Sequence, residues 1–260
     1  MKYNDQYRGI DFLWYTYFGI TKTAALKPEK SAGGYREARK RCIWRAYRDL
    51  NRTLGFTYSG SALNKKPTTI MKSYEKSKED FKFEAESFLQ ERLSILLGEV
   101  DSNKDGFDDW HEKTCNELVK KASDWERKGV HLFKKGGFTY GHAQKWVNMT
   151  LKNMLVMNSW GLWSEKLNRF AEFMHIPIDN YILAEAHEKL KKSNCFGLRT
   201  RKNGDQFYIT FDKEGNNNKK TWSQLDCYDQ YKQLEDALIS CIDEDKMAIE
   251  WETDAWLGDN

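Results

Sequence analysis

This 260-residue chain contains little proline and no long apolar run. Only three prolines are present, which leaves room for long helices because proline removes a backbone donor and breaks a helix. Apolar runs such as residues 154–157 fall far short of the roughly 18 residues that a membrane-spanning helix needs. Residues 12–18 are mostly aromatic, but no small-residue cleavage site follows them, so a secretory signal is not expected.

The chain also lacks closely spaced cysteine pairs. Its five cysteines are odd in number and widely scattered, at Cys42, Cys115, Cys195, Cys227 and Cys241. Secreted disulfide frameworks use an even number of cysteines, so we expect reduced thiols and a cytoplasmic protein. Glycine-rich phosphate loops and the sequence patterns of serine-hydrolase triads do not appear either.

Basic residues are concentrated in one segment, although the whole chain carries a net charge of only +3. Between residues 36 and 52, seven Lys and Arg residues outnumber two acidic ones, whereas residues 243–260 are acidic. A basic helix can follow a phosphate backbone, or it can be an ordinary solvated helix whose Ile43, Tyr47 and Leu50 turn inward. The residues expected to contact DNA are Arg36, Arg39, Lys40, Arg45 and Arg48 in this segment and Lys152 farther along.

Apolar spacing predicts a mainly helical protein. Steps of three and four residues predict helices over residues 34–54, 74–98, 108–122, 163–174 and 180–192, with others beginning at Thr139 and near a capping box of Ser223 and Asp226. The pair Asn203-Gly204 lies between two β-like runs and predicts a hairpin near residues 196–211. We expect one domain over residues 1–260, with about nine helices and the hairpin as an insertion. Its 37 aromatic residues suit either an aromatic core or surfaces that stack on flat ligands.

Two local patterns resemble metal-binding motifs. Asp101, Asn103, Asp105 and Glu112, with Gly106 at the sharp turn, match the template of a calcium-binding EF-hand loop. The same spacing also suits an acidic turn before a helix, because Asp and Asn cap helix N-termini. His111 and Cys115 form half of a zinc-protease pattern, but no further ligand completes it, so a half-buried structural pair is favoured over a zinc site.

The stretch from residue 138 to residue 183 carries two motifs of one enzyme family. Residues 176–182 resemble the P-V-D-x-x-V segment of the helix-hairpin-helix DNA glycosylases, in which the Asp that opens a helix is catalytic. Residues 144–147 resemble the lysine-bearing helix of the archaeal 8-oxoguanine glycosylase branch. Together with residues 35–54 and 107–115, they are similar to bacterial proteins assigned an 8-oxoguanine DNA glycosylase (OGG) fold. The resemblance makes residues 134–192 the glycosylase core.

The resemblance implies a role for each matching residue. Lys145 would be the nucleophile that attacks C1′ of the deoxyribose, and Asp179 the carboxylate that balances the developing positive charge and accepts a proton. No cofactor is required, and Lys152 and Lys166 are the reserve nucleophiles. The expected base pocket comprises Phe138, His142, Gln144, Trp146 and Tyr181. Structural interpretations stay open beside these roles: Trp146 falls on a core stripe, Asp179 suits an ordinary N-cap, and Lys145 suits a solvated face.

Two departures from the family pattern bear on these roles. Tyr181 stands where many members carry His or Arg, and no glycine-rich hairpin is recognisable between residues 157 and 162. We therefore expect a monomeric DNA glycosylase that flips and excises a damaged or modified base, 8-oxoguanine by resemblance, with lyase activity through a Lys Schiff base. DNA would be its partner, and membrane association is not expected. The alternatives are a non-catalytic DNA-binding protein of the same fold, for instance in phage defence, and a calcium-binding interaction protein built on residues 101–112.

Overall fold

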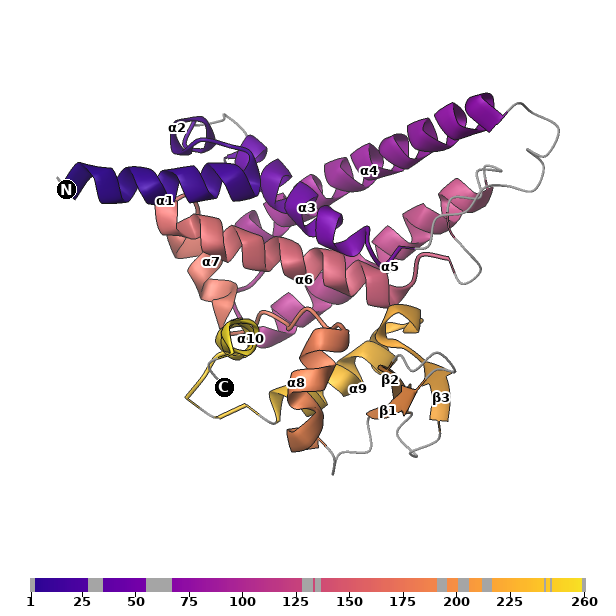
Figure 1. Cartoon of the computed structure of the whole chain (residues 1–260). Coiled ribbons are helices and arrows are strands. Elements are labelled where there is room, and N and C mark those ends of the chain that lie inside the picture. The colour runs from indigo at the N-terminus through magenta and orange to yellow at the C-terminus, as the bar shows by residue number, and fades with distance from the viewer. Residues whose placement is uncertain are drawn as a thin grey trace.

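A computed structural model describes residues 3–27, 35–54, 67–127, 133, 137–190, 196–200, 206–211, 217–240, 242–243 and 245–258. Over these ranges the protein is mainly helical, as predicted, with ten α-helices where about nine were expected, and one small sheet (Figure 1). The helices are α1 (Tyr3–Phe18), α2 (Lys22–Ala25), α3 (Arg36–Leu50), α4 (Pro67–Gly98), α5 (Lys104–Arg127), α6 (Tyr140–Met157), α7 (Ser164–Ala171), α8 (Asn180–Leu190), α9 (Tyr228–Ile239) and α10 (Ala248–Leu257). Across the described ranges, no helix combines the length and apolar character needed to cross a membrane.

Helix α6 is the central element, and the other helices pack around it (Figure 1). It contacts α3 and α5 most extensively, and fourteen of its eighteen residues are buried. Burial on nearly all sides differs from the single apolar face that its periodicity predicts. The polar residues among the fourteen are therefore inside the protein, where each needs a hydrogen-bonding partner. Thr139 begins the helix as predicted, with its Oγ1 accepting from the backbone N–H of His142 at 3.3 Å.

Helix α3 combines a basic sequence with an apolar inner face. Ile43, Tyr47 and Leu50 are buried as predicted, and they pack toward α6. Arg39 is the exception among the basic residues because it is only 2% exposed. Its Nε donates to Gln90 Oε1 of α4 at 3.0 Å, so Arg39 joins two helices and cannot contact DNA. The prediction that Arg39 contacts DNA is therefore wrong.

Between α7 and α8 the chain runs without regular secondary structure through Pro177, whose neighbours Ile176 and Ile178 are fully buried. Asp179 then caps α8, and its Oδ1 accepts from the backbone N–H of Tyr181 at 2.9 Å and of Ile182 at 3.1 Å. This is the N-cap that the sequence predicts, and it fixes the direction in which the second carboxylate oxygen points.

The predicted hairpin is present as strands β1 (Phe196–Thr200) and β2 (Gln206–Phe211), which pair antiparallel with Thr200 opposite Gln206. The turn that joins them lies outside the described residues. A third strand, β3 (Asn217–Lys220), extends the sheet. This strand is not among the predicted elements, because its Asn and Lys residues have little strand propensity.

The segment after the sheet differs in detail from the prediction. A short 3-10 helix, η3 (Trp222–Gln224), precedes α9, and Thr221 with Gln224 forms its capping box. Cys227 is the residue before α9, so the predicted box of Ser223 and Asp226 is wrong. Cys42, Cys115 and Cys227 are free thiols, as expected, whereas Cys195 and Cys241 lie outside the described residues.

Candidate functional site

Lys145 of α6 and Asp179, which caps the N-terminus of α8, lie side by side where the two helices come together. The Lys145 Nζ lies 2.8 Å from Asp179 Oδ2, although 34 residues separate the two in sequence. The side chains are 9% and 16% exposed, so the pair is largely removed from solvent without being sealed. An ion pair in such a position is held much more firmly than one on the surface.

The surroundings of this pair are aromatic on one side. The Lys145 ammonium lies 4.9 Å from the centre of the Trp222 ring, a cation-π contact. His142, one turn earlier on α6, is neutral at pH 7 because burial and the nearby Lys145 charge lower its pKa to about 4. Its Nδ1 accepts from the Thr139 backbone N–H at 3.2 Å, so the proton of the neutral ring is on Nε2.

A small pocket of about 240 Å³ opens directly onto the pair. It is lined by Thr53, Lys145, Asp179, Asn180, Tyr181, Thr221, Trp222 and Ser223. A cavity of this size is somewhat smaller than typical drug-sized sites of roughly 300 to 1,000 Å³ and suits one small ring system. Its lining combines a reactive amine, a carboxylate, hydroxyl groups and aromatic surface.

A second ion pair and a ring stack border the same region. Lys152 lies two helical turns beyond Lys145 on α6, and its Nζ contacts Glu252 of α10. Glu252 is fully buried, and burial raises its pKa while Lys152 opposes the shift. On the neighbouring turn of α10, the Trp256 ring stacks on Tyr181 at 4.1 Å between ring centres and is 51% exposed. Lys152 is therefore paired with Glu252 and only partly exposed, and its contact with DNA stays a prediction.

Four of the five residues predicted to line a base pocket do not line the one beside Lys145. Trp146 is fully buried and donates from Nε1 to the Ile43 carbonyl at 3.1 Å, which places it in the core. Gln144, His142 and Phe138 are also buried and outside the pocket lining. Only Tyr181 is where the prediction put it. The error follows from treating sequence proximity to Lys145 as spatial proximity, since α6 is covered on nearly all sides.

The residues that the prediction missed come from segments remote in sequence. Trp222 is the clearest case, because it lies 77 positions after Lys145 and reaches the pair through η3. Thr53 follows α3, and Thr221 and Ser223 flank Trp222. A lone Trp in a polar segment was the only sequence signal available for this wall of the pocket.

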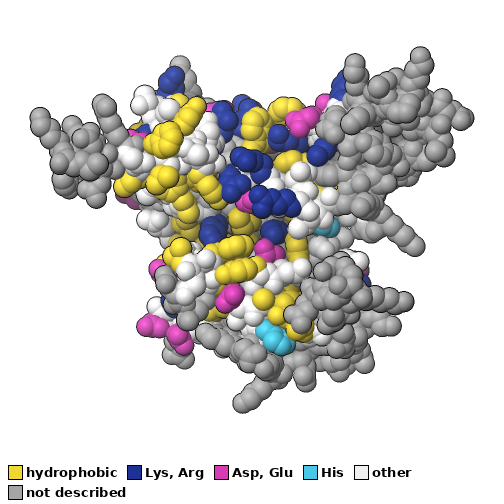
Figure 2. Space-filling view, in the orientation of Figure 1, with side chains coloured by type: hydrophobic (Ala, Val, Ile, Leu, Met, Phe, Trp, Pro, Cys, Tyr) yellow, Lys and Arg dark blue, Asp and Glu magenta, His cyan; other side chains and the backbone are white. Residues whose placement is uncertain are grey.

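Basic side chains gather over α3 and the adjoining part of α6 on the face shown in Figure 2. Arg36 and Arg48 are exposed, and Lys40 and Arg45 are partly exposed. Lys40 lies 4.5 Å from the Trp44 ring centre, whereas Arg45 bonds Asp49 at 3.1 Å and covers the Tyr17 ring. These four predicted DNA contacts are therefore at least partly accessible, in contrast to Arg39. Because Thr53 lines the pocket three residues after α3 ends, the basic helix leads to the Lys145–Asp179 pair.

The calcium-loop prediction is wrong. Helix α5 already begins at Lys104, and the Asn103 Oδ1 accepts from the Gly106 backbone N–H at 2.8 Å as a helix cap. Asp105 and Glu112 are consequently about two turns apart on one helix, roughly 10 Å along its axis, and cannot share an ion with Asp101.

His111 and Cys115, which form half of a zinc-protease pattern, are both fully buried. Across the described part of the chain, no group of three or more His, Cys, Asp or Glu residues could hold a metal.

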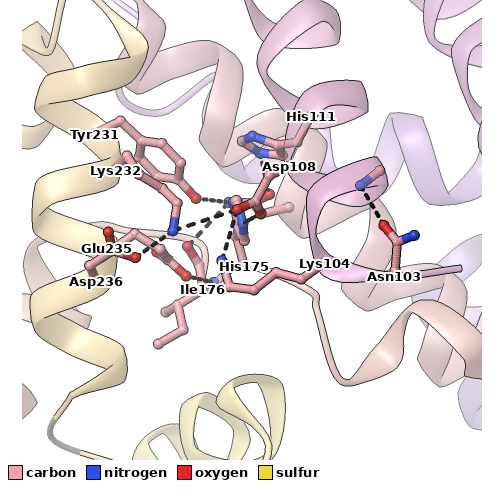
Figure 3. Close-up of polar contacts among 12 residues, drawn as sticks. Asn103, Lys104, Asp108, His111, His175, Ile176, Tyr231, Lys232, Glu235 and Asp236 are labelled. Carbon is pink, nitrogen blue, oxygen red and sulfur yellow. Dashed lines mark hydrogen bonds and ion pairs between the residues drawn. The ribbon is translucent and has the colours of Figure 1, made fainter. Parts of the chain in front are cut away.

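A polar network joins α5, α9 and the segment before α8 (Figure 3), and it reaches α6 through the contact of His111 with Asn148. Asp108 Oδ1 lies 2.7 Å from His175 Nε2, and its Oδ2 accepts from Lys104 at 2.8 Å. Burial raises the pKa of Asp108, but hydrogen bonds from His175 and Lys104 outweigh burial and hold this pKa well below its usual range. Burial lowers the pKa of His175, and on α9 the Glu235 Oε1 accepts from the Ile176 backbone N–H at 2.7 Å.

Glu235 makes the stability of the protein depend on pH. Burial raises its pKa to about 8, with the Ile176 N–H opposing the shift. Between about pH 4.5 and pH 8 the unfolded chain loses a proton that the folded state keeps, so the free energy of unfolding falls as the pH rises, by up to about 1.4 kcal/mol per unit. Glu235→Gln mimics the protonated side chain and keeps the acceptor for Ile176. Urea unfolding at pH 5 to 8 should show a shallower decline for the variant, and equal declines would contradict the role of Glu235.

Comparisons with known proteins give no independent family assignment. No protein-family model, no curated protein and no solved structure matches this chain. The Lys145–Asp179 geometry and the pocket around it therefore carry the functional argument.

Proposed function

We propose that this protein is a DNA glycosylase with associated lyase activity, in which Lys145 is the nucleophile and Asp179 its carboxylate partner. The observation that carries the proposal is the 2.8 Å contact between Lys145 Nζ and Asp179 Oδ2 at the base of an open pocket. A structural ion pair needs no access, whereas a nucleophile must reach its substrate.

The proposed chemistry uses each group of the pair. Lys145 must lose a proton before it can attack, and Asp179 Oδ2 is placed to receive it. The amine lone pair then forms a bond to C1′ of the target nucleotide, while the bond from C1′ to the base breaks and its electron pair leaves with the base, which takes up a proton. Loss of a second proton from nitrogen and opening of the sugar ring, with protonation of the ring oxygen, complete a Schiff base. Asp179 passes the Lys145 proton to the departing base, so its carboxylate is ionised again beside C1′ while positive charge develops there.

DNA is the proposed substrate because the accessible basic residues lead to this pocket. Arg48 and Arg52 are exposed near the end of α3, and Thr53 follows in the pocket wall. Phosphates attract such side chains without regard to base sequence. A base inside a duplex cannot reach a recessed amine, so the target nucleotide would have to be flipped out and held in the pocket. The Trp222 and Tyr181 rings supply aromatic surface for it, and 8-oxoguanine is the first base to test.

Borohydride trapping tests the proposal directly. The whole protein is mixed with duplexes that contain 8-oxoguanine or an abasic site, in the presence of sodium borohydride, and separated under denaturing conditions. Reduction of a Schiff base adds hydride to C1′ and leaves a stable protein–DNA adduct, which we expect with the abasic duplex. An undamaged duplex is the control. Salt-dependent DNA binding with neither an adduct nor strand cleavage on any lesion would overturn the enzyme and favour the non-catalytic DNA-binding alternative.

A further inference from the structure

Two buried amide side chains of α6 hold the backbone that leads into Asp179. Gln144, the residue before Lys145, donates from Nε2 to the Ile178 carbonyl at 3.0 Å and accepts from the Ile178 N–H at 3.3 Å. Gln144 therefore binds both backbone polar groups of the residue before Asp179. It is fully buried, and so is Ile178.

Asn148 holds the same segment one turn farther along α6. Its Nδ2 lies 3.2 Å from the Ile176 carbonyl and 3.2 Å from Gln144 Oε1, so it joins the backbone to the first amide. Its Oδ1 lies 2.8 Å from His111 Nε2 of α5. From the opposite side, Glu235 Oε1 accepts the Ile176 N–H at 2.7 Å. Residues 176 and 178 are thus fixed between two helices.

The position of this segment matters because it has no regular secondary structure of its own. A buried backbone without helix or sheet partners must find other hydrogen bonds, and Pro177 contributes no N–H. Lys145 follows Gln144 on the rigid α6, while Asp179 follows Ile178. The two hydrogen bonds between Gln144 and Ile178 consequently set the spacing of the pair. A displacement of about 1 Å between reacting groups can cost roughly 100-fold in rate.

We propose that Gln144 and Asn148 are positioning residues that set the distance between Lys145 and Asp179, an inference that rests on the proposed function of that pair. Neither residue lines the pocket, so neither touches the substrate. Their effect passes through the backbone of residues 176–178.

The test compares Gln144→Met with a matched control on the same helix. Methionine has a similar length and keeps the packing, but it loses both bonds to Ile178. Asn153→Leu is the control because Asn153 is also a buried amide of α6, and its Nδ2 bonds the Cys42 carbonyl of α3 at 3.3 Å, away from Asp179. Urea unfolding shows whether the two variants lose comparable stability.

Under single-turnover conditions with saturating enzyme, Gln144→Met should form the trapped adduct about 100-fold more slowly than wild type. Its affinity for a duplex with a tetrahydrofuran abasic analogue should stay within about threefold, because the pocket surface is unchanged. Asn153→Leu should keep the wild-type rate within about threefold. Equal rates in Gln144→Met and wild type, or an equal loss in Asn153→Leu, would overturn the positioning role.

A second measurement does not depend on catalysis. Acetylation of Lys145 by an N-hydroxysuccinimide ester, followed by peptide mass spectrometry, should become several-fold faster in Gln144→Met and stay unchanged in Asn153→Leu, because an amine released from its carboxylate reacts more readily. If wild type forms no adduct with DNA, the proposed function fails while this measurement still tests the positioning. If Gln144→Met does not fold, Asn148→Ser is tested in its place. Serine loses the hydrogen bond from Asn148 Nδ2 to the Ile176 carbonyl, and its smaller side chain leaves room for a water molecule. Unchanged Lys145 acetylation in the folded variant would overturn the inference.

Discussion

Lys145→Gln should abolish the borohydride-trapped adduct, because among the residues that the structure describes no other amine lines the pocket beside Asp179. Glutamine keeps a polar N–H donor on a side chain one atom shorter, and the N-cap bonds to Asp179 Oδ1 do not involve residue 145, so the fold and the N-cap of α8 should survive. The expected result is no detectable adduct with an abasic duplex, with DNA binding retained. Gel electrophoresis of labelled DNA measures the adduct, and thermal unfolding verifies the fold.

Two other lysines serve as controls for this experiment. Lys166 is exposed on α7 and outside the pocket lining, so Lys166→Gln should form the adduct at the wild-type rate. Lys152 is the nearest rival nucleophile by sequence, but Glu252 holds its amine. A full yield of adduct in Lys145→Gln would contradict the assignment and make Lys152 the next candidate.

Asp179→Asn should slow formation of the adduct by about 10³-fold while it preserves the helix that Asp179 begins. Asparagine caps helices about as well as aspartate, so the bonds from Tyr181 and Ile182 to Oδ1 can persist. What the substitution removes is the negative charge beside C1′ and the acceptor for the Lys145 proton. Groups of this kind typically contribute roughly 10² to 10⁴ in rate.

Single-turnover kinetics on an abasic duplex measure the effect of Asp179→Asn. Affinity for the same duplex, measured without borohydride, should not fall, because removal of a negative charge does not weaken attraction to phosphate. Asp179→Ala is the comparison, since it removes both the charge and the cap and should also cost about 1 kcal/mol of stability. A wild-type rate in Asp179→Asn would reduce Asp179 to a helix cap.

Periodicity identified most of the helices because each buries apolar residues at steps of three and four. The hairpin was predictable from Asn203-Gly204, and the start of α8 from Asp179 after Pro177, since turn and cap preferences act over a few residues. Motif matching failed at residues 101–112, where local helix capping by Asn103 outweighs the loop template. The same pattern of Asp, Asn and Gly suits both structures, and only the backbone distinguishes them.

The sequence by itself determined that the chain is mainly helical, and through a resemblance to the DNA glycosylases it predicted that Lys145 and Asp179 come together. Only the tertiary structure decided that their side chains are 2.8 Å apart, that Trp222 and Thr53 complete the pocket, and that Trp146 and Arg39 are buried. Helical periodicity reports which positions avoid water, but not which distant segment covers them. Residues such as Trp222 reach the site through long-range packing, and that packing leaves no local trace in the sequence.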